Sequence, residues 1–200
     1  MQSDVQLIII TGPPGSGKSH FAQLVVARFP GFHLLAYDTV KERYFDCYGF
    51  ASLSEREKLN ARSLEAFYKE MDAEMSRKTR LVVEYPFCKK HEPELNRLVV
   101  QHGYHALTIE LVGNPYVLWQ RSIVRDVNAC DRHPGHLCAK YHFGVIPKSE
   151  DYIPEMNYEE FVRQGEQKNY HITVGNHLNV DVTDFDAIDY ESVWNKIRST

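Results

Sequence analysis

The sequence predicts an α/β fold in three layers, with a five-stranded parallel sheet, helices on both of its faces and a lid. Short apolar segments alternate along the chain with segments in which apolar residues recur at helical spacing, an order typical of parallel sheets. The first apolar segment, residues 5–10, is almost uninterrupted, as expected for a central strand buried on both faces. Residues 128–151 show neither pattern and accumulate His, Pro, Gly and Tyr, which predicts a long functional loop, the lid.

Apolar runs rich in branched residues predict the strands. They lie at residues 5–10, 32–36, 81–85, 106–112 and 178–182. Gly12 stops the first strand, Asp38 follows the second, and Glu84 lies at the end of the third. Polar side chains therefore arrive at the carboxyl edge of the sheet, where open α/β sheets bind their ligands.

Helices are predicted between the strands from the helical period of the apolar positions. They run from Gly17 to Phe29, at residues 39–48, from Ser54 to about Lys78, from Pro93 to Gly103, from Pro115 onward, at residues 158–167 and at residues 190–197. Pro30 ends the first helix, and Ser54 with Glu57 forms a capping box for the third. Pro93 opens the fourth helix and Gly103 closes it, the usual placement of these two residue types.

Composition is close to the globular average and predicts one domain spanning residues 1–200, with the lid as an insertion at about 128–151. The longest uncharged apolar stretch near the N-terminus is too short for a membrane span or a signal-peptide core, so a cytoplasmic protein away from membranes is expected. A net charge of -4 disfavours nucleic acid as a partner without excluding it. The sequence leaves the oligomeric state open.

A phosphate-binding loop lies between the first strand and the first helix. It fits the pattern G-x-x-x-x-G-K-[ST] and comprises Gly12, Pro13, Pro14, Gly15, Ser16, Gly17, Lys18 and Ser19. In this setting backbone N–H groups surround an anion, Lys18 bridges the β- and γ-phosphates, and the Ser19 hydroxyl is a ligand for Mg²⁺. The loop therefore predicts a P-loop NTPase fold with ATP and Mg²⁺ as cofactors. It does not by itself separate a kinase from an ATPase or a nucleotide switch.

Two carboxylates at strand ends are candidates for the acceptor side of the site. Asp38 can face a γ-phosphate from the end of the second strand, and Lys41 follows it one helical turn later. The alternative for Asp38 is a helix N-cap. Glu84 can hold a magnesium-bound water or an acceptor group, or can merely end the third strand.

Arg121 and Arg125 lie one turn apart on one face of the helix that precedes the lid. Guanidinium groups in this place neutralise charge that develops on a transferred phosphoryl group. The alternative is an exposed helix face with ordinary salt bridges. Arg132, in the lid, is a third candidate for contact with the nucleotide.

The phosphate loop, Asp38 followed by Lys41, the two helix arginines and the His-Pro-Gly-His sequence at 133–136 together resemble the P-loop kinases related to chloramphenicol phosphotransferase and polynucleotide kinase. The resemblance spans most of the chain, and only the phosphate loop is highly specific. It implies an ATP-dependent phosphotransferase in which Asp38 orients or deprotonates the acceptor hydroxyl. It also implies that Arg121 and Arg125 flank the lid and act on the transferred group.

The lid also carries residues that bind zinc in other proteins. Cys130, His133, His136 and Cys138 have the right ligand types for a tetrahedral site, but their spacing is tighter than in any standard zinc motif. The kinase resemblance accounts for both histidines without metal. We therefore predict that the lid binds no stoichiometric zinc.

The function predicted from these residues is transfer of the γ-phosphoryl group of ATP to a hydroxyl of a small molecule. Aromatic residues near the second and third strands suggest a ring-containing acceptor, with core packing as their alternative role: Tyr37, Tyr44, Tyr48, Tyr85 and Phe87. A 5′-hydroxyl polynucleotide kinase is the first rival, supported only by short basic clusters at 77–80 and 89–90. A non-kinase switch or ATPase is the second, and the guanine-specificity pattern N-K-x-D is missing from the sequence.

Overall fold

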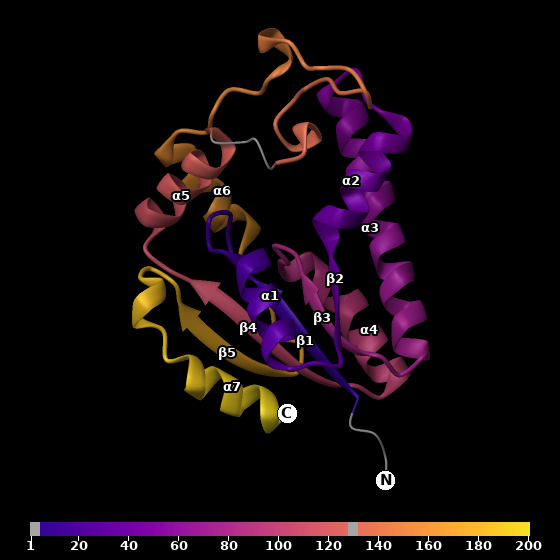
Figure 1. The fold of residues 1–200 in the computed structure, drawn as a ribbon, viewed down its shortest axis with the longest axis vertical. Coiled ribbons are helices and arrows are strands. Elements are labelled where there is room, and N and C mark those ends of the chain that lie inside the picture. The colour runs from indigo at the N-terminus through magenta and orange to yellow at the C-terminus, as the bar shows by residue number, and fades with distance from the viewer. Residues whose placement is uncertain (1–4, 128–131) are drawn as a thin grey trace.

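A computed structural model describes residues 5–127 and 132–200 and confirms the predicted α/β architecture. The sheet has five strands in the order β2-β3-β1-β4-β5, and every pair of neighbours is parallel (Figure 1). The strands are β1 Gln6–Thr11, β2 Phe32–Ala36, β3 Arg80–Glu84, β4 His105–Val112 and β5 Asn176–Asp181. Each lies within two residues of its predicted position.

Helices cover both faces of this sheet, so the chain folds in three layers (Figure 1). They are α1 Lys18–Arg28, α2 Tyr37–Tyr48, α3 Leu53–Ser76, α4 Glu92–His102, α5 Pro115–Val127, α6 Tyr158–Lys168 and α7 Tyr190–Arg198. One hydrophobic cluster joins α3 and α4 to the sheet, and a second joins α1, α5, α6 and α7 to its other face.

The central strand β1 shows why the predicted apolar run is almost uninterrupted. All six of its residues are buried. Leu7 and Ile9 belong to the cluster on one face, while Ile8 and Ile10 belong to the cluster on the other, because successive side chains of a strand point in opposite directions. Gln6 is the one polar residue of the run, and its buried side chain donates to the carbonyl oxygen of Ile197 and accepts from Arg80.

Two helix beginnings differ from the prediction. The N-cap of α3 is Ser52 rather than Ser54: the Ser52 hydroxyl accepts from the Glu55 amide at 3.3 Å, and the Glu55 carboxylate accepts from the Ala51 amide, one residue before the N-cap, at 2.8 Å. Both serines are followed three residues later by Glu, and the sequence could not show which pair would cap. Helix α2 begins at Tyr37, directly after β2.

The lid crosses from α5 and α6 to the tops of α2 and α3 (Figure 1). Tyr141 pairs with Phe50, just beyond α2, through two backbone hydrogen bonds of 2.8 Å. Both side chains pack with Phe45 and Leu59 in a small third cluster. The described part of the lid, residues 132–151, thus rests on α2 and α3 and contains only short 3₁₀ turns. Within the two described ranges, no helix is both long and apolar enough to cross a membrane.

Candidate functional site

The parallel register of the sheet brings three separate chain segments to one edge. Ile10 of β1 lies opposite Glu84 of β3, and Glu84 lies opposite Ala36 of β2. The phosphate loop follows β1 directly and α2 follows β2 directly, so the loop, Glu84 and the first turn of α2 lie at the same end of the sheet.

The phosphate loop needs its glycines at two positions. Gly15 and Gly17 have φ values of 76° and 78°, which L side chains rarely adopt. A Cβ on Gly15 would lie 2.0 Å from the carbonyl oxygen of Leu118, so the loop also packs tightly against α5. The buried Ser16 hydroxyl has no hydrogen-bond partner among the described residues. A polar cradle with an unused hydroxyl fits the phosphates of a nucleotide.

Lys18, the first residue of α1, is almost fully buried, with 9% of its surface exposed. Its Nζ donates to the carbonyl oxygen of Pro13 at 2.9 Å, which holds the ammonium over the loop. Burial lowers the pKa of Lys18 to about 8, while the nearby Glu84 carboxylate opposes that shift and Arg125 adds to it. A buried ammonium held in this way is stabilised most by a polyanionic ligand.

Ser19 and Glu84 meet beside Lys18. The Ser19 hydroxyl donates to Glu84 Oε2 at 3.2 Å. The Glu84 carboxylate is buried, and burial raises its pKa, with the charge of Lys18 acting in the opposite direction. A hydroxyl and a carboxylate are the oxygen ligands that Mg²⁺ takes together with waters and phosphates, so this pair fits a nucleotide-bound Mg²⁺.

Asp38 lies in the first turn of α2, and the helix N-cap is Ala36, so the N-cap interpretation of Asp38 is wrong. Its carboxylate pairs with Lys41 Nζ at 3.0 Å and keeps 43% of its side-chain surface exposed. Burial raises the pKa of Asp38, but the charges of Lys41 and His136 and the hydrogen bond from Lys41 outweigh it and leave the pKa at about 2. The carboxylate is therefore ionised at every physiological pH.

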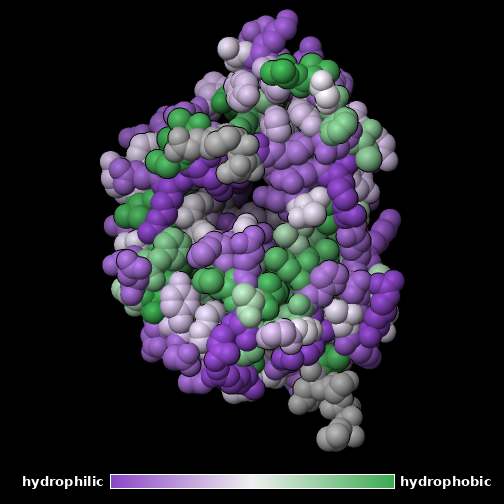
Figure 2. All heavy atoms as spheres, viewed as in Figure 1, coloured by the Kyte–Doolittle hydropathy of each residue, from purple (hydrophilic) through white to green (hydrophobic). Residues whose placement is uncertain are grey.

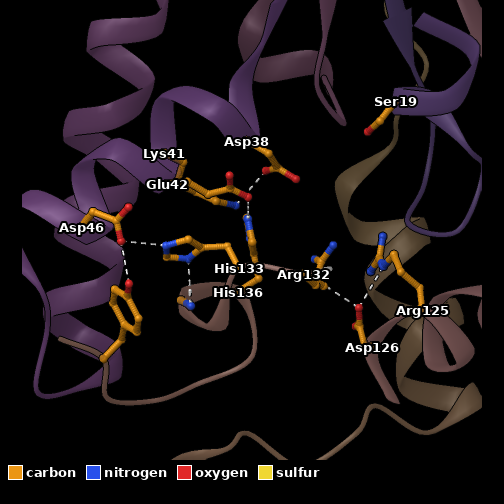
Figure 3. A network of polar contacts seen from close by, with 12 residues as sticks. Ser19, Asp38, Lys41, Glu42, Asp46, Arg125, Asp126, Arg132, His133 and His136 are labelled. Carbon is orange, nitrogen blue, oxygen red and sulfur yellow. Dashed lines mark hydrogen bonds and ion pairs between the residues drawn. The ribbon is translucent and has the colours of Figure 1, made fainter. Parts of the chain in front are cut away.

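The three arginines divide into two groups. Arg125 Nε and Arg132 Nε both approach Asp126 Oδ1, at 2.8 and 3.2 Å, so one carboxylate holds two guanidinium groups (Figure 3). Arg121 instead donates to the carbonyl oxygens of Val182 and Thr183, beyond β5, at 2.5 and 2.8 Å. The guanidinium of Arg121 also lies over the ring of Phe185, 4.4 Å from its centroid.

One cavity of about 580 Å³ joins these groups. Lys18 and Ser19 of the phosphate loop line this cavity. It is also lined by every predicted site residue outside the loop: Asp38, Lys41, Glu84, Arg121, Arg125 and Arg132. Figure 2 shows the corresponding face hollowed beneath the lid. Phe185 also lines the cavity and was not predicted, because no motif marks the turn after β5.

The aromatic residues suggested for the acceptor pocket separate into three groups. Tyr37 and Tyr85 line the cavity, with ring centroids 4.3 Å apart. Phe87 is fully buried in the core and cannot contact an acceptor. Tyr44 and Tyr48 lie on α2 beside Arg62, whose guanidinium is 4.4 Å from the Tyr48 ring centroid.

The lid histidines contact carboxylates of α2. His133 Nε2 lies 2.9 Å from Asp46 Oδ1, and His136 Nε2 lies 2.8 Å from Glu42 Oε1 (Figure 3). Glu42 and Asp46 are one turn apart on one helix face, yet their partners lie 87 or more residues away along the chain, so no local sequence pattern indicates the pairing. Cys130 of the zinc alternative lies outside the described residues. The absence of lid zinc stays a prediction.

A family model described as AAA domain matches residues 7–133, which is more than half of the chain. Comparison with curated proteins finds no match.

Solved structures share the fold at low sequence identity. A provisionally assigned kinase from Chloroflexus aurantiacus J-10-fl is 22% identical with a TM-score of 0.77, over 98% of both chains. The tunicamycin resistance protein of Deinococcus radiodurans is 15% identical with a TM-score of 0.55, over 98% of this chain and 94% of that one. A gluconokinase from Sinorhizobium meliloti 1021 is 14% identical with a TM-score of 0.54, over 90% and 85%. These likenesses show a fold shared with P-loop kinases, and the matched family model shows that the chain belongs to the AAA domain family.

Proposed function

We propose that this protein is a kinase that transfers the γ-phosphoryl group of ATP, bound with Mg²⁺, to a hydroxyl of a small-molecule acceptor. The observation that supports it best is the convergence of three kinds of group on one cavity: the phosphate-loop residues Lys18 and Ser19, the Glu84 carboxylate and the Asp38 carboxylate. An ATPase or a nucleotide switch needs only the phosphate-loop residues and the Glu84 carboxylate. A second carboxylate in the same cavity gives an acceptor hydroxyl a place to bind.

In this proposal each group has one task. Lys18, Arg125 and Arg132 neutralise charge on the phosphates. Ser19 and Glu84 would hold Mg²⁺, which would supply further positive charge to the phosphates. Asp38 accepts a hydrogen bond from the acceptor hydroxyl and aims its oxygen at the γ-phosphorus. With a pKa of about 2, Asp38 is a weak base, so it takes the proton late, as suits a loose phosphoryl transition state.

The acceptor is proposed to be small because the basic clusters of the chain do not form a groove beside the cavity. Arg77 pairs with Glu74 at 2.6 Å, Lys89 pairs with Glu92 at 2.9 Å, and Arg80 lies over the Phe32 ring at 4.1 Å. None of the three lines the 580 Å³ cavity. A polyanion would find these charges already compensated.

A screen of acceptors with γ-labelled ATP tests the proposal. The panel should contain gluconate and other sugars, nucleosides, hydroxylated antibiotics and 5′-hydroxyl oligonucleotides, each at two salt concentrations. Solved structures with this fold include a gluconokinase, a sugar kinase and a tunicamycin resistance protein. We expect efficient labelling of one small-molecule class with little dependence on salt. Efficient labelling of oligonucleotides alone near physiological salt would establish the polynucleotide kinase instead. ATP hydrolysis with no labelled acceptor from a full metabolite extract would contradict the kinase assignment.

The two helix arginines are expected to differ in their effects. Arg125→Ala should lower kcat by at least about 100-fold, because a guanidinium that faces the transferred group acts mainly in the transition state. Arg121→Ala should mainly raise the KM for ATP, because Arg121 is tied to the turn after β5 and stacked on Phe185. Steady-state kinetics of both variants provide the measurement. A larger loss of kcat in Arg121→Ala than in Arg125→Ala would reverse these roles.

The pKa of Lys18 predicts a pH dependence of ATP binding. Since burial lowers this pKa to about 8 in the free protein, the Lys18 side chain carries its positive charge below that pH and loses the charge above it. Bound phosphates raise the pKa again, so binding above pH 8 requires proton uptake and the Kd for ATP should rise by up to about tenfold per pH unit. Calorimetry at pH 7, 8 and 9 in buffers of different ionisation enthalpy measures both effects. An unchanged Kd without proton uptake at pH 9 would contradict the burial of a charged Lys18.

A further inference from the structure

A second group of polar side chains lies outside the kinase cavity, where β4, β5 and the segment between α6 and β5 meet. It comprises Glu110, His171 and His177, whose ligand atoms all lie within 4.8 Å of one another. None of the three lines the 580 Å³ cavity. We propose that this triad binds a divalent transition-metal ion of the zinc class.

The fold brings the three residues together from separate segments. Ala106, Thr108 and Glu110 alternate along β4 and share one face of the sheet. The Thr108 hydroxyl donates to the carbonyl oxygen of Val174 at 2.8 Å, which fixes residues 169–175 over that face and places His171 at Glu110. His177 comes from β5, which pairs with β4 in parallel. The triad is thus held by strand register and one buried hydrogen bond.

The distances within the triad suit a tetrahedral ion. Glu110 Oε2 lies 2.8 Å from His171 Nδ1 and 3.2 Å from His177 Nε2. Ligands about 2.1 Å from a zinc ion stand about 3.4 Å apart in a tetrahedron, so small side-chain movements would admit the ion. Two imidazoles and a carboxylate form a donor set that zinc commonly takes, with a fourth position left for water.

The charges and protons of the triad also favour an ion. The Glu110 side chain is 11% exposed, and within the described part of the chain its ion-pair partners are these two histidines alone. Neutral imidazoles would leave a buried carboxylate charge uncompensated, and buried charges are normally paired or bound to metal. His177 Nε2 also lies 2.7 Å from Asn179 Oδ1, so two oxygen acceptors compete for its one proton. A cation at this point would satisfy both oxygens.

The site is also accessible. A cavity of about 280 Å³ is lined by Glu110 and His171 and reaches Pro13, on the back of the phosphate loop. His171 keeps 52% of its side-chain surface exposed. An ion can therefore enter from solvent, and the fourth coordination position can carry a water that points into this cavity.

Titration of untagged full-length protein with ZnCl2 and CoCl2 tests the proposal. We expect one ion per chain by elemental analysis after dialysis, visible absorption bands typical of tetrahedral cobalt, and a rise in Tm of several degrees with saturating zinc. His171→Ala and Glu110→Gln should each weaken binding at least tenfold and remove the cobalt bands. His171 is half-exposed, so the His171→Ala protein should fold, which far-UV circular dichroism would verify.

Two further variants separate this site from other histidines. His33→Ala is the matched control, because His33 is 55% exposed and pairs with the single carboxylate of Glu74 at 3.5 Å, and zinc binding should be unchanged in it. Cys138→Ser removes one of the four lid residues and should also leave zinc binding unchanged. Three outcomes would each overturn the proposal. Zinc could bind stoichiometrically to both triad variants, zinc binding could be lost in Cys138→Ser, or the parent protein could show no saturable binding at micromolar zinc.

Discussion

Lys18→Ala is expected to abolish phosphoryl transfer while the protein stays folded. The Lys18 ammonium is buried at the first turn of α1, held over the phosphate loop by Pro13, and shares its cavity with Arg125 and Arg132. A single hydrogen-bond donor placed where charge develops in the transition state contributes about 10²–10³-fold to turnover. A full positive charge at the β- and γ-phosphates contributes at least as much. We therefore expect kcat/KM to fall by about 10³-fold or more.

The fold should survive this change because Lys18 contributes a buried charge rather than apolar packing. Burial lowers its pKa, which means that the folded state pays to keep the ammonium charged at neutral pH. The Tm of Lys18→Ala should consequently lie within a few degrees of the parent value. Lys89→Ala, which removes an exposed lysine paired with Glu92, is the matched control and should keep full activity. A folded Lys18→Ala protein with normal turnover would show that phosphate binding occurs elsewhere.

Asp38→Asn is expected to lower kcat by about 10²-fold or more and to leave the Kd for ATP within about threefold. The amide keeps the size of the side chain but removes the charge that orients the acceptor hydroxyl and finally receives its proton. In the proposed function Asp38 faces the acceptor. Its carboxylate is paired with Lys41, and no contact joins it to the phosphate loop among the hydrogen bonds and ion pairs of the described residues. Nucleotide binding should therefore be nearly independent of it.

Single-turnover kinetics with the best acceptor, combined with ATP calorimetry, separate these two quantities for Asp38→Asn. Asp72→Asn is a suitable control, because Asp72 is a partly exposed carboxylate on α3 that pairs with His102 and does not line the cavity. It should change neither quantity. Loss of ATP affinity with turnover preserved would instead assign Asp38 to the metal–nucleotide side of the site.

The strands and the phosphate loop could be predicted because their signals are local. The middle of β1, residues 7–10, is apolar because it is buried on both faces, and β2 was placed at its observed residues, 32–36. The end of α4 at Gly103, with a φ of 68°, follows equally from one residue type that tolerates a left-handed conformation. Short-range sequence patterns report such features directly, since the forces that set them act within a few residues.

The sequence also determined which polar residues would reach the carboxyl edge of the sheet, because parallel strands must end on the same side. Asp38, Glu84 and the phosphate loop could thus be grouped before any coordinates were known. The hydrogen-bond and ion-pair partners of these residues could not be predicted, because they depend on side-chain direction and on packing between distant segments. The hydrogen bond from Ser19 to Glu84 joins residues 65 positions apart, and Arg121 reaches Val182 across 61.

Only the tertiary structure decided the docking of the lid and the second polar group. His133 and His136 meet α2 because the lid folds back over it, and the zinc-like spacing of lid residues gave no sign of those carboxylate partners. Glu110, His171 and His177 form no recognisable motif, yet strand register and the fixed segment 169–175 bring them within 4.8 Å. A sequence states which side chains are available, but long-range register and helix packing decide which of them can meet.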